Sequence, residues 1–255
     1  MEAFMKFYQV LSKYYDSIFP FDQTTFAFLL HNLPPRSRVL DIACGTGTYS
    51  IPLAEAGCAV TGIDADPSMI ENAREKDTAC KVKFIAAPMG KIEGIFPSSS
   101  FDGAFCIGNS LVHLTDLEYV EKFFEDTGTI LKKGGKLIVQ IINFDRILNK
   151  RLPGLPAINA PGIEFIRRYR ASEEEELTGS EEKVIFDTEL VVKQSEGAEN
   201  RMHQEVQLLA LRKESLVAAV ETAGFQDVRL FGSFEGSPFN PEESVPLILS
   251  ATATR

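Results

Sequence analysis

The sequence predicts an α/β fold in which a doubly wound, mostly parallel seven-stranded sheet carries an antiparallel β-sheet inserted after its fifth strand. Three observations predict it. Short apolar runs typical of buried strands alternate with amphipathic helical segments over residues 36–149. The alternation stops over residues 150–211, where strand-like stretches follow one another without helices, and it resumes over residues 212–255. A chain of 255 residues is long enough for one large domain with such an insertion.

Residues 1–35 are expected to form two helices ahead of the first strand. The segment from Phe4 to about Ile18 is amphipathic. Asp22 can accept hydrogen bonds from the amides that open a second helix, which then ends at Pro34. The first strand is expected soon afterwards, where the spacing of apolar residues changes from the helical to the extended pattern.

Five strand-like runs follow, separated by helices or turns. Asp66 precedes a proline and is a typical start for the helix after the second strand. Thr115 and Glu118 have the spacing of a capping box for the helix after the fourth strand, and Gly134 and Gly135 are expected to end that helix. The five strands are expected at residues 38–43, 58–64, 82–87, 101–109 and 135–143.

The inserted segment begins with residues 150–162, which are rich in Pro, Gly and Ala and in which no strand is predicted. Three strands of an antiparallel sheet are expected after it, and the acidic run Glu173–Glu176 is most simply a solvated hairpin tip. These strands are expected at residues 163–171, 182–193 and 201–211, and the last two strands of the α/β sheet at residues 225–232 and 246–254.

Composition and charge exclude several classes of partner. The chain has 26 Lys and Arg against 36 Asp and Glu, a net charge of −10, and it contains no long basic run, which argues against nucleic acid and anionic lipid surfaces. Its beginning lacks the pattern of a secretory signal, and no apolar run is long enough to span a bilayer, so a cytoplasmic protein is expected. The four cysteines have no metal-binding spacing and are expected to be reduced thiols; no metal site is predicted.

The segment from residue 39 to residue 50 is the most informative for function. Gly45 and Gly47 lie between a strand and a helix, where the backbone can approach a ligand closely. Asp64 ends the second strand, where nucleotide-binding folds place the acid that binds ribose hydroxyls. Asp41, upstream of the glycines, would repel a pyrophosphate but favours a ligand with positive charge. S-adenosylmethionine meets both demands better than NAD or FAD.

These residues resemble the class I S-adenosylmethionine-dependent methyltransferases, which have a Rossmann-like fold. The signature D-x-G-x-G-x-G corresponds to residues 41–47, with Ala43 in place of the first glycine. The family's acidic contact to the adenine amino group would fall at residues 87–89, where no carboxylate stands. The resemblance implies a cofactor site formed by Tyr14, Asp41, Ala43, Cys44, Gly45, Gly47, Asp64, Ala65, Met69, Pro88, Met89, Ile107 and Asn109.

Within that family the motifs look most like those of glycine and sarcosine N-methyltransferases and related small-molecule enzymes. This resemblance implies an N-terminal segment, residues 1–35, that covers the cofactor and brings Tyr15 to the methyl-donor site. Asn109 is a candidate to orient the acceptor and His113 a candidate base, although a packed structural histidine is the commoner role. Ile142 stands where the glycine enzymes carry the arginine that holds the acceptor carboxylate, so glycine is not a safe assignment.

The insertion, residues 150–211, is interpreted as a lid that selects the acceptor. It leaves the sheet at the edge where Gly45, Asp64 and Asn109 are expected to converge. Polar groups on its strands could reach the acceptor, or they could form one solvated face of the sheet. They are Arg167, Arg168 and Arg170 on the first strand and Arg201, His203, Glu205 and Gln207 on the third.

The expected activity is therefore methyl transfer from S-adenosylmethionine to a small-molecule acceptor, most simply an amine. Two alternatives remain on the same residues: an oxidoreductase with an NAD-type cofactor, and a non-catalytic protein that binds S-adenosylmethionine. Measuring the binding of S-adenosylhomocysteine and of NAD distinguishes a methyltransferase from an oxidoreductase. Testing for methylation of an amine and alcohol library distinguishes the methyltransferase from a non-catalytic binding protein. The acceptor, the methylated atom and the oligomeric state are left open by the sequence.

Overall fold

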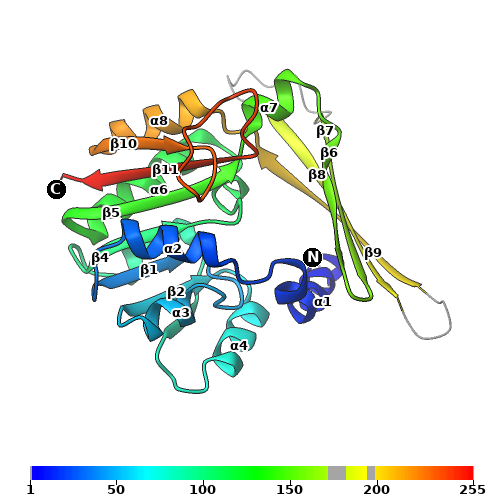
Figure 1. Ribbon diagram of the computed structural model, residues 1–255, viewed down its shortest axis with the longest axis horizontal. Coiled ribbons are helices and arrows are strands. Elements are labelled where there is room, and N and C mark those ends of the chain that lie inside the picture. The colour runs from blue at the N-terminus through cyan, green and yellow to red at the C-terminus, as the bar shows by residue number, and fades with distance from the viewer. Residues whose placement is uncertain (1, 172–181, 194–198, 255) are drawn as a thin grey trace.

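The computed structural model describes residues 2–171, 182–193 and 199–254. It consists of an α/β domain, a second β-sheet beside it, and an N-terminal helix between the two (Figure 1). The helices are α1 (Glu2–Ile18), α2 (Gln23–Asn32), α3 (Ser50–Glu55), α4 (Pro67–Lys76), α5 (Ile92–Ile95), α6 (Leu117–Ile130), α7 (Phe144–Asn149) and α8 (Lys213–Thr222), with short 3-10 turns η1 (Met89–Lys91) and η2 (Leu111–His113).

The α/β domain contains a seven-stranded sheet in the order β10-β11-β5-β4-β1-β2-β3. Every pair in it is parallel except those made by β11, which lies antiparallel between β5 and β10. This confirms the predicted doubly wound, mostly parallel sheet. Its strands are β1 (Arg38–Ile42), β2 (Ala59–Asp64), β3 (Lys83–Ala86), β4 (Phe101–Cys106), β5 (Leu131–Ile142), β10 (Phe225–Phe231) and β11 (Pro246–Ala253).

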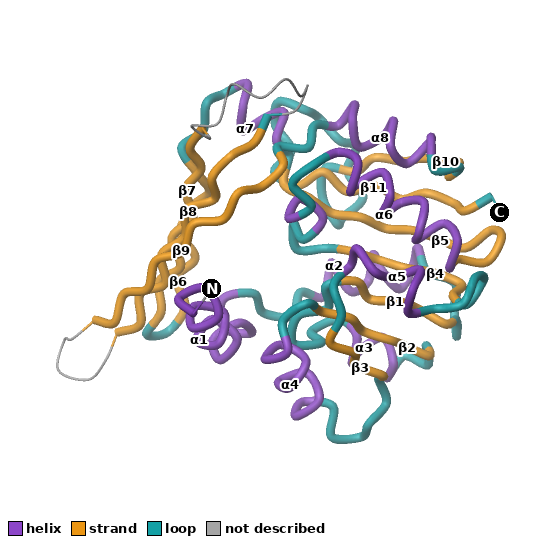
Figure 2. The backbone as a smooth tube through the Cα atoms, turned by 180° about the vertical axis from the view of Figure 1, so that it is seen from behind, coloured by secondary structure: helices purple, strands orange, loops and turns teal. Residues whose placement is uncertain are grey.

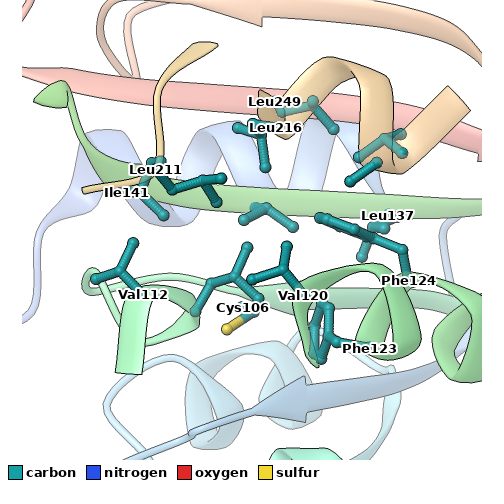
Figure 3. Close-up of a cluster of buried hydrophobic side chains, with 14 of the residues drawn as sticks. Cys106, Val112, Val120, Phe123, Phe124, Leu137, Ile141, Leu211, Leu216 and Leu249 are labelled. Atoms are coloured by element: carbon teal, nitrogen blue, oxygen red, sulfur yellow. The ribbon is translucent and has the colours of Figure 1, made fainter. Parts of the chain in front are cut away.

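Two apolar layers cover this sheet, because its strands are apolar on both faces. On one face, α5, α6 and α8 bury a large cluster that includes Phe123, Phe124 and Leu216 (Figure 3). On the other face, α2 and α3 pack on strands β1, β2, β4, β5 and β11, and α4 packs on Phe84 of β3. Helices on both faces leave the carboxyl edge of the parallel strands as the place where a ligand can bind.

The inserted segment forms a four-stranded antiparallel sheet, in the order β6-β7-β8-β9 (Figure 2). The expected strands correspond to β7, β8 and β9, but a fourth strand, β6, which the sequence did not predict, lies within residues 150–162. Pairing with β7 supplies the backbone hydrogen bonds that its Pro-, Gly- and Ala-rich sequence does not indicate. The strands are β6 (Gly154–Ala160), β7 (Ile163–Ala171), β8 (Lys183–Lys193) and β9 (Glu199–Leu209).

Two local predictions around α6 were also wrong. Asp116, not Thr115, is the N-cap residue, and the Thr115 hydroxyl instead donates to the Asp116 carboxylate at 3.2 Å. The helix ends at Ile130, and Gly134 and Gly135 lie within β5 rather than at the helix end. The helix is capped by Asp116 instead of Thr115, and β5 begins at Leu131, so the two glycines are already part of the strand. The acidic run 173–176 lies outside the described residues.

Helix α1 joins the second sheet to the α/β domain. Phe19, just beyond its end, packs edge-on against Phe165 of β7 at 5.7 Å between ring centroids, and Leu11 and Ile18 belong to the same apolar cluster. On its other side, the side-chain amide of Asn72 in α4 donates to the Ser12 carbonyl at 3.1 Å. No helix in the described part of the chain is both long enough and apolar enough to cross a membrane.

Candidate functional site

The candidate site lies at the carboxyl edge of the α/β sheet, where β1, β2 and β4 end. Parallel pairing of β1 with both β2 and β4 aligns the ends of these strands, so the loops after them meet. These loops hold Gly45, Asp64 and Asn109, which the sequence predicted to converge. Helix α1 lies beside the same edge (Figure 2).

The loop after β1 bends through three left-handed positions. Ala43, Gly45 and Gly47 have φ values of 61°, 54° and 75°. A side chain on Gly47 would overlap the Phe84 ring, since an added Cβ would lie 2.8 Å from it. Glycine is therefore required at Gly47 by both conformation and space, and Gly45 needs it for its φ. The absence of side chains at these two positions lets Tyr15 and Phe84 pack directly against the loop backbone.

Asp64 at the end of β2 holds this loop in place. Its carboxylate accepts from the Gly45 amide and from the Asp66 amide, both at 2.9 Å. Burial raises the pKa of Asp64, while these amide hydrogen bonds oppose that rise. A carboxylate with two oxygens can accept further hydrogen bonds, so Asp64 remains able to bind the hydroxyl groups of a ligand.

Asp41 lies beneath the loop in β1 and is only 3% exposed. The Ser50 hydroxyl donates to it at 2.6 Å. Burial raises the pKa of Asp41 to about 7, and the nearby charge of Asp64 adds to that rise. An acid that is hard to ionise in the free protein favours a cationic ligand, because a positive charge nearby would stabilise the ionised form.

Tyr15 of α1 covers the glycine loop. Its ring and hydroxyl would lie 3.2–3.3 Å from a Cβ added to Gly45, so the aromatic ring rests against the loop backbone. Burial, followed by the charges of Asp64 and Asp41, raises the pKa of Tyr15 and keeps its hydroxyl protonated. Tyr14 is half-buried in the cluster between α1 and the second sheet. The two tyrosines are thus in different surroundings.

Four residues that the sequence analysis did not identify fasten α1 to the loop. Asp16 accepts from the hydroxyls of Thr46 at 2.6 Å and Thr48 at 3.1 Å, and it pairs with Lys76 of α4 at 2.8 Å. The pKa of Asp16 is lowered because hydrogen bonds from Lys76 and Thr46 outweigh burial. No local signal could have found this contact, because the partners are 30 and 60 residues away in the chain.

The remaining residues predicted for the cofactor flank this centre. Met69 is buried in the first turn of α4, Met89 is half-buried in η1, and Ala65 and Pro88 are exposed beside them. Cys44 is buried and packs with residues of α4, and burial raises the pKa of its thiol, so it is not a nucleophile. No carboxylate stands at residues 87–89, as the sequence indicated.

Asn109 is held tightly after β4. It has a left-handed φ of 64°, and its side-chain oxygen accepts from the Ile142 amide at 2.8 Å. The side-chain carbonyl oxygen is therefore used to join this loop to β5, and the side-chain nitrogen is the donor that Asn109 could offer to a ligand. Ile107 is half-buried two residues earlier. His113 is exposed in η2.

Ala43 offers a test of the backbone conformation in this loop. We expect Ala43→Gly to raise the free energy of unfolding by about 0.5–1 kcal/mol, because glycine removes the clash of a Cβ at positive φ. Ala56, with φ of −75°, is the matched control, and Ala56→Gly should lower stability by about as much. Urea unfolding measures both; equal losses in the two variants would contradict the left-handed assignment.

Comparisons with known proteins agree with this site. Residues 39–135 match the methyltransferase domain family. YqeM of Bacillus subtilis, itself named only provisionally as a methyltransferase, is 34% identical over 138 residues, which are 52% of this chain and 55% of that protein. Human glycine N-methyltransferase is 32% identical over 126 residues, 44% of this chain and 43% of that protein. The chain thus spans about half the length of these curated relatives.

A solved structure resembles the fold over nearly its whole length. It is a S-adenosylmethionine-dependent methyltransferase from Clostridium acetobutylicum, with a TM-score of 0.76. The alignment covers 97% of this chain and 99% of that one, at 16% sequence identity. The similarity therefore includes the inserted sheet as well as the α/β domain, and at this identity it concerns the fold.

Proposed function

We propose that the chain is a class I methyltransferase that transfers a methyl group from S-adenosyl-L-methionine to a small-molecule amine. The single observation that carries the proposal is the pairing of an open glycine loop with two carboxylates, Asp41 beneath it and Asp64 beside it. An NAD-type oxidoreductase is not favoured, because the family match and the relatives are methyltransferases.

The residues present fit the cofactor. Asp64 is placed to accept hydrogen bonds from the ribose hydroxyls, and we assign the amino-acid end of the cofactor to the backbone of the loop at Gly45 and Gly47. Asp41 supplies negative charge for the cationic groups of the ligand. We assign the apolar contacts of the adenine ring to Met69 and Met89, with Ala65, Pro88 and Ile107 around them.

The cofactor supplies a methyl group that is already activated for displacement, so the protein mainly positions the acceptor and excludes water. Tyr15 contributes to both, because it covers the loop at Gly45 and keeps its proton as a donor. We propose that the Asn109 amide orients the acceptor amine. His113 is the candidate to remove a proton from an ammonium form of the acceptor.

We propose that the chain works as three cooperating parts. Residues 1–35 cover the cofactor, residues 36–149 and 212–255 bind it, and the inserted residues 150–211 select the acceptor. The contact of Phe19 with Phe165 supports this division, because it fastens the cover to the insertion. We also propose a cytoplasmic location, in keeping with the buried free thiols of Cys44 and Cys106.

The proposed function is tested by two measurements on the whole chain. Calorimetry should show binding of S-adenosylhomocysteine and no comparable binding of NAD. Incubation of the protein with S-adenosylmethionine and matched libraries of amines, alcohols and thiols, followed by mass spectrometry, should detect methylated amines. Binding of the cofactor without transfer to any library would contradict the enzyme and support a regulatory protein.

Asn109 separates acceptor positioning from structure. Asn109→Asp keeps the oxygen that accepts from the Ile142 amide, but replaces the amide donor, so thermal stability should be kept while turnover falls about 10-fold or more. Asn109→Ala removes both roles and should lower stability as well. If affinity for S-adenosylhomocysteine and turnover fall in parallel in Asn109→Asp, this residue belongs to the cofactor site instead.

A further inference from the structure

The two faces of the inserted sheet carry charge in different ways. On the outer face, arginines and acids form ion pairs: Arg168 and Arg201 both pair with Glu189, at 3.4 and 2.8 Å, and Arg170 pairs with Glu205. These are exposed or half-exposed groups that neutralise one another. The solvated polar face that the sequence left as an alternative therefore accounts for most of the arginines of β7.

Arg167 lies on the opposite, inner face. Side chains alternate between the faces of a strand, so Arg167 shares its face with Phe165 and Tyr169. Phe165 packs against Phe19, which follows α1, while Tyr169 packs against Phe144 of α7, at 5.9 Å between ring centroids. Arg167 thus lies between the contact with the helix that covers the glycine loop and the contact with the segment after β5.

The polar atoms at this position are buried without sufficient partners. One guanidinium nitrogen of Arg167 donates to the Pro156 carbonyl at 2.6 Å, but its Nε is buried and has no hydrogen-bond partner among the described residues. Tyr169 is 7% exposed, and its hydroxyl is likewise buried without a hydrogen-bond partner among the described residues. Loss of solvent raises the pKa of Tyr169, so its hydroxyl keeps its proton as a hydrogen-bond donor; it also lowers the pKa of Arg167, because it penalises the charged guanidinium.

Arg167 is half-buried, and a charge that is partly removed from water normally has an acidic partner. The chain is rich in acids, with a net charge of −10, and still no described carboxylate pairs with Arg167. Its cross-strand neighbour on β8 is Thr188, whose hydroxyl donates to the Gln204 carbonyl. The inner face therefore holds two donor atoms without a partner in the described part of the protein, Nε of Arg167 and the hydroxyl of Tyr169, on residues two positions apart and among mainly apolar side chains.

We propose that Arg167 and Tyr169 bind a carboxylate on the acceptor. The planar guanidinium matches a carboxylate in shape, and the neutral tyrosine hydroxyl adds a third donor. The stacked rings of Tyr169 and Phe186, at 5.2 Å, form an apolar wall beside these donors. This inference rests on the proposed function: it makes the acceptor an amine with a carboxylate, held from the inserted sheet although Ile142 offers no charge after β5.

The test uses para-fluorobenzoate and its uncharged relative para-fluorobenzamide as probes, followed by fluorine NMR with S-adenosylhomocysteine present. Wild-type protein should bind the acid at least about 10-fold more tightly than the amide. Arg167→Gln should remove most of that preference, and Tyr169→Phe should weaken it. Arg168→Gln is the matched control. Arg168 is the next residue in the sequence, but its side chain pairs with Glu189 on the outer face, so its replacement should leave binding unchanged.

A thermal measurement distinguishes binding from a structural role. Arg167→Gln should keep or raise the melting temperature, because it removes an unpaired buried charge; a structural arginine would lose stability instead. Equal binding of the acid and the amide, or equal losses in Arg167→Gln and Arg168→Gln, would overturn the inference. Affinity for S-adenosylhomocysteine is measured first: its absence contradicts the proposed function, whereas its presence with no preference for the acid contradicts this inference alone.

Discussion

Asp64→Ala is expected to weaken binding of S-adenosylhomocysteine about 10-fold or more, the largest change that we expect from one side chain of the cofactor site. Hydrogen bonds to a charged group contribute about 1.5–3 kcal/mol, and alanine removes the acceptor for the ribose hydroxyls. It also releases the amides of Gly45 and Asp66, so the loop is less well held before the ligand arrives. Isothermal titration calorimetry measures the affinity directly.

Asp66 provides the control for that variant. It is an acid two residues away that caps α4, accepting from the Ser68 amide and hydroxyl. Asp66→Ala should cost about 1 kcal/mol of stability through the lost helix cap, but leave the affinity for S-adenosylhomocysteine nearly unchanged. If both variants lose affinity to the same extent, Asp64 acts by keeping the loop folded and makes no contact of its own.

Asp41 is expected to make both stability and cofactor binding depend on pH. Its pKa in the folded protein, about 7, lies above the ordinary 3.8. The folded state therefore holds the Asp41 proton more tightly than the unfolded state does. The contribution of Asp41 to the free energy of unfolding is fully present below about pH 4, where the acid is protonated in the folded and the unfolded state, and it is lost as pH rises toward 7. A shift of this size corresponds to a loss on the order of 4 kcal/mol in the free energy of unfolding.

The pH dependence of S-adenosylmethionine binding should have the opposite sign to that of stability, because the positive charge of the ligand favours ionised Asp41. Affinity should rise as pH increases through about 7, and binding below that pH should release protons. Calorimetry in buffers of different ionisation enthalpy counts those protons. Asp41→Asn keeps an acceptor for the Ser50 hydroxyl but cannot ionise, so it should remove both pH dependences. Proton release that persists in this variant would assign it to another group.

Much of the fold was predictable because each strand of the α/β domain is a short apolar run with a helix or turn after it. Strand β6 was not, since Pro156 and its neighbours form a strand only by pairing with β7. The glycines within β5 and the true cap of α6 were missed for a related reason. At these positions, pairing and neighbouring side chains outweigh the local preference of glycine or threonine.

The candidate site divides in the same way. The glycine loop, Asp41 and Asp64 were identified because they lie close together in sequence and their spacing is set by the strand and turn. Asp16 and Lys76 were not, because their pairing depends on how α1 packs on the domain. Arg167 was noticed only as one of three arginines. The alternation of side chains along a strand places Arg167 and Arg168 on opposite faces of the inserted sheet. Only the packing of the sheet shows which of these faces is covered by the rest of the protein.

Strand β11 has a consequence for the order in which the protein assembles. It lies between β5 and β10, and β10 has no other neighbour in the sheet. During synthesis, residues 225–231 emerge before the strand that will hold them, so β10 stays unpaired until residues 246–253 are available. An exposed strand edge is prone to join another chain. Fast closure by β11 is thus a safeguard against aggregation, and stalled synthesis before residue 246 would expose the edges of β5 and β10 together.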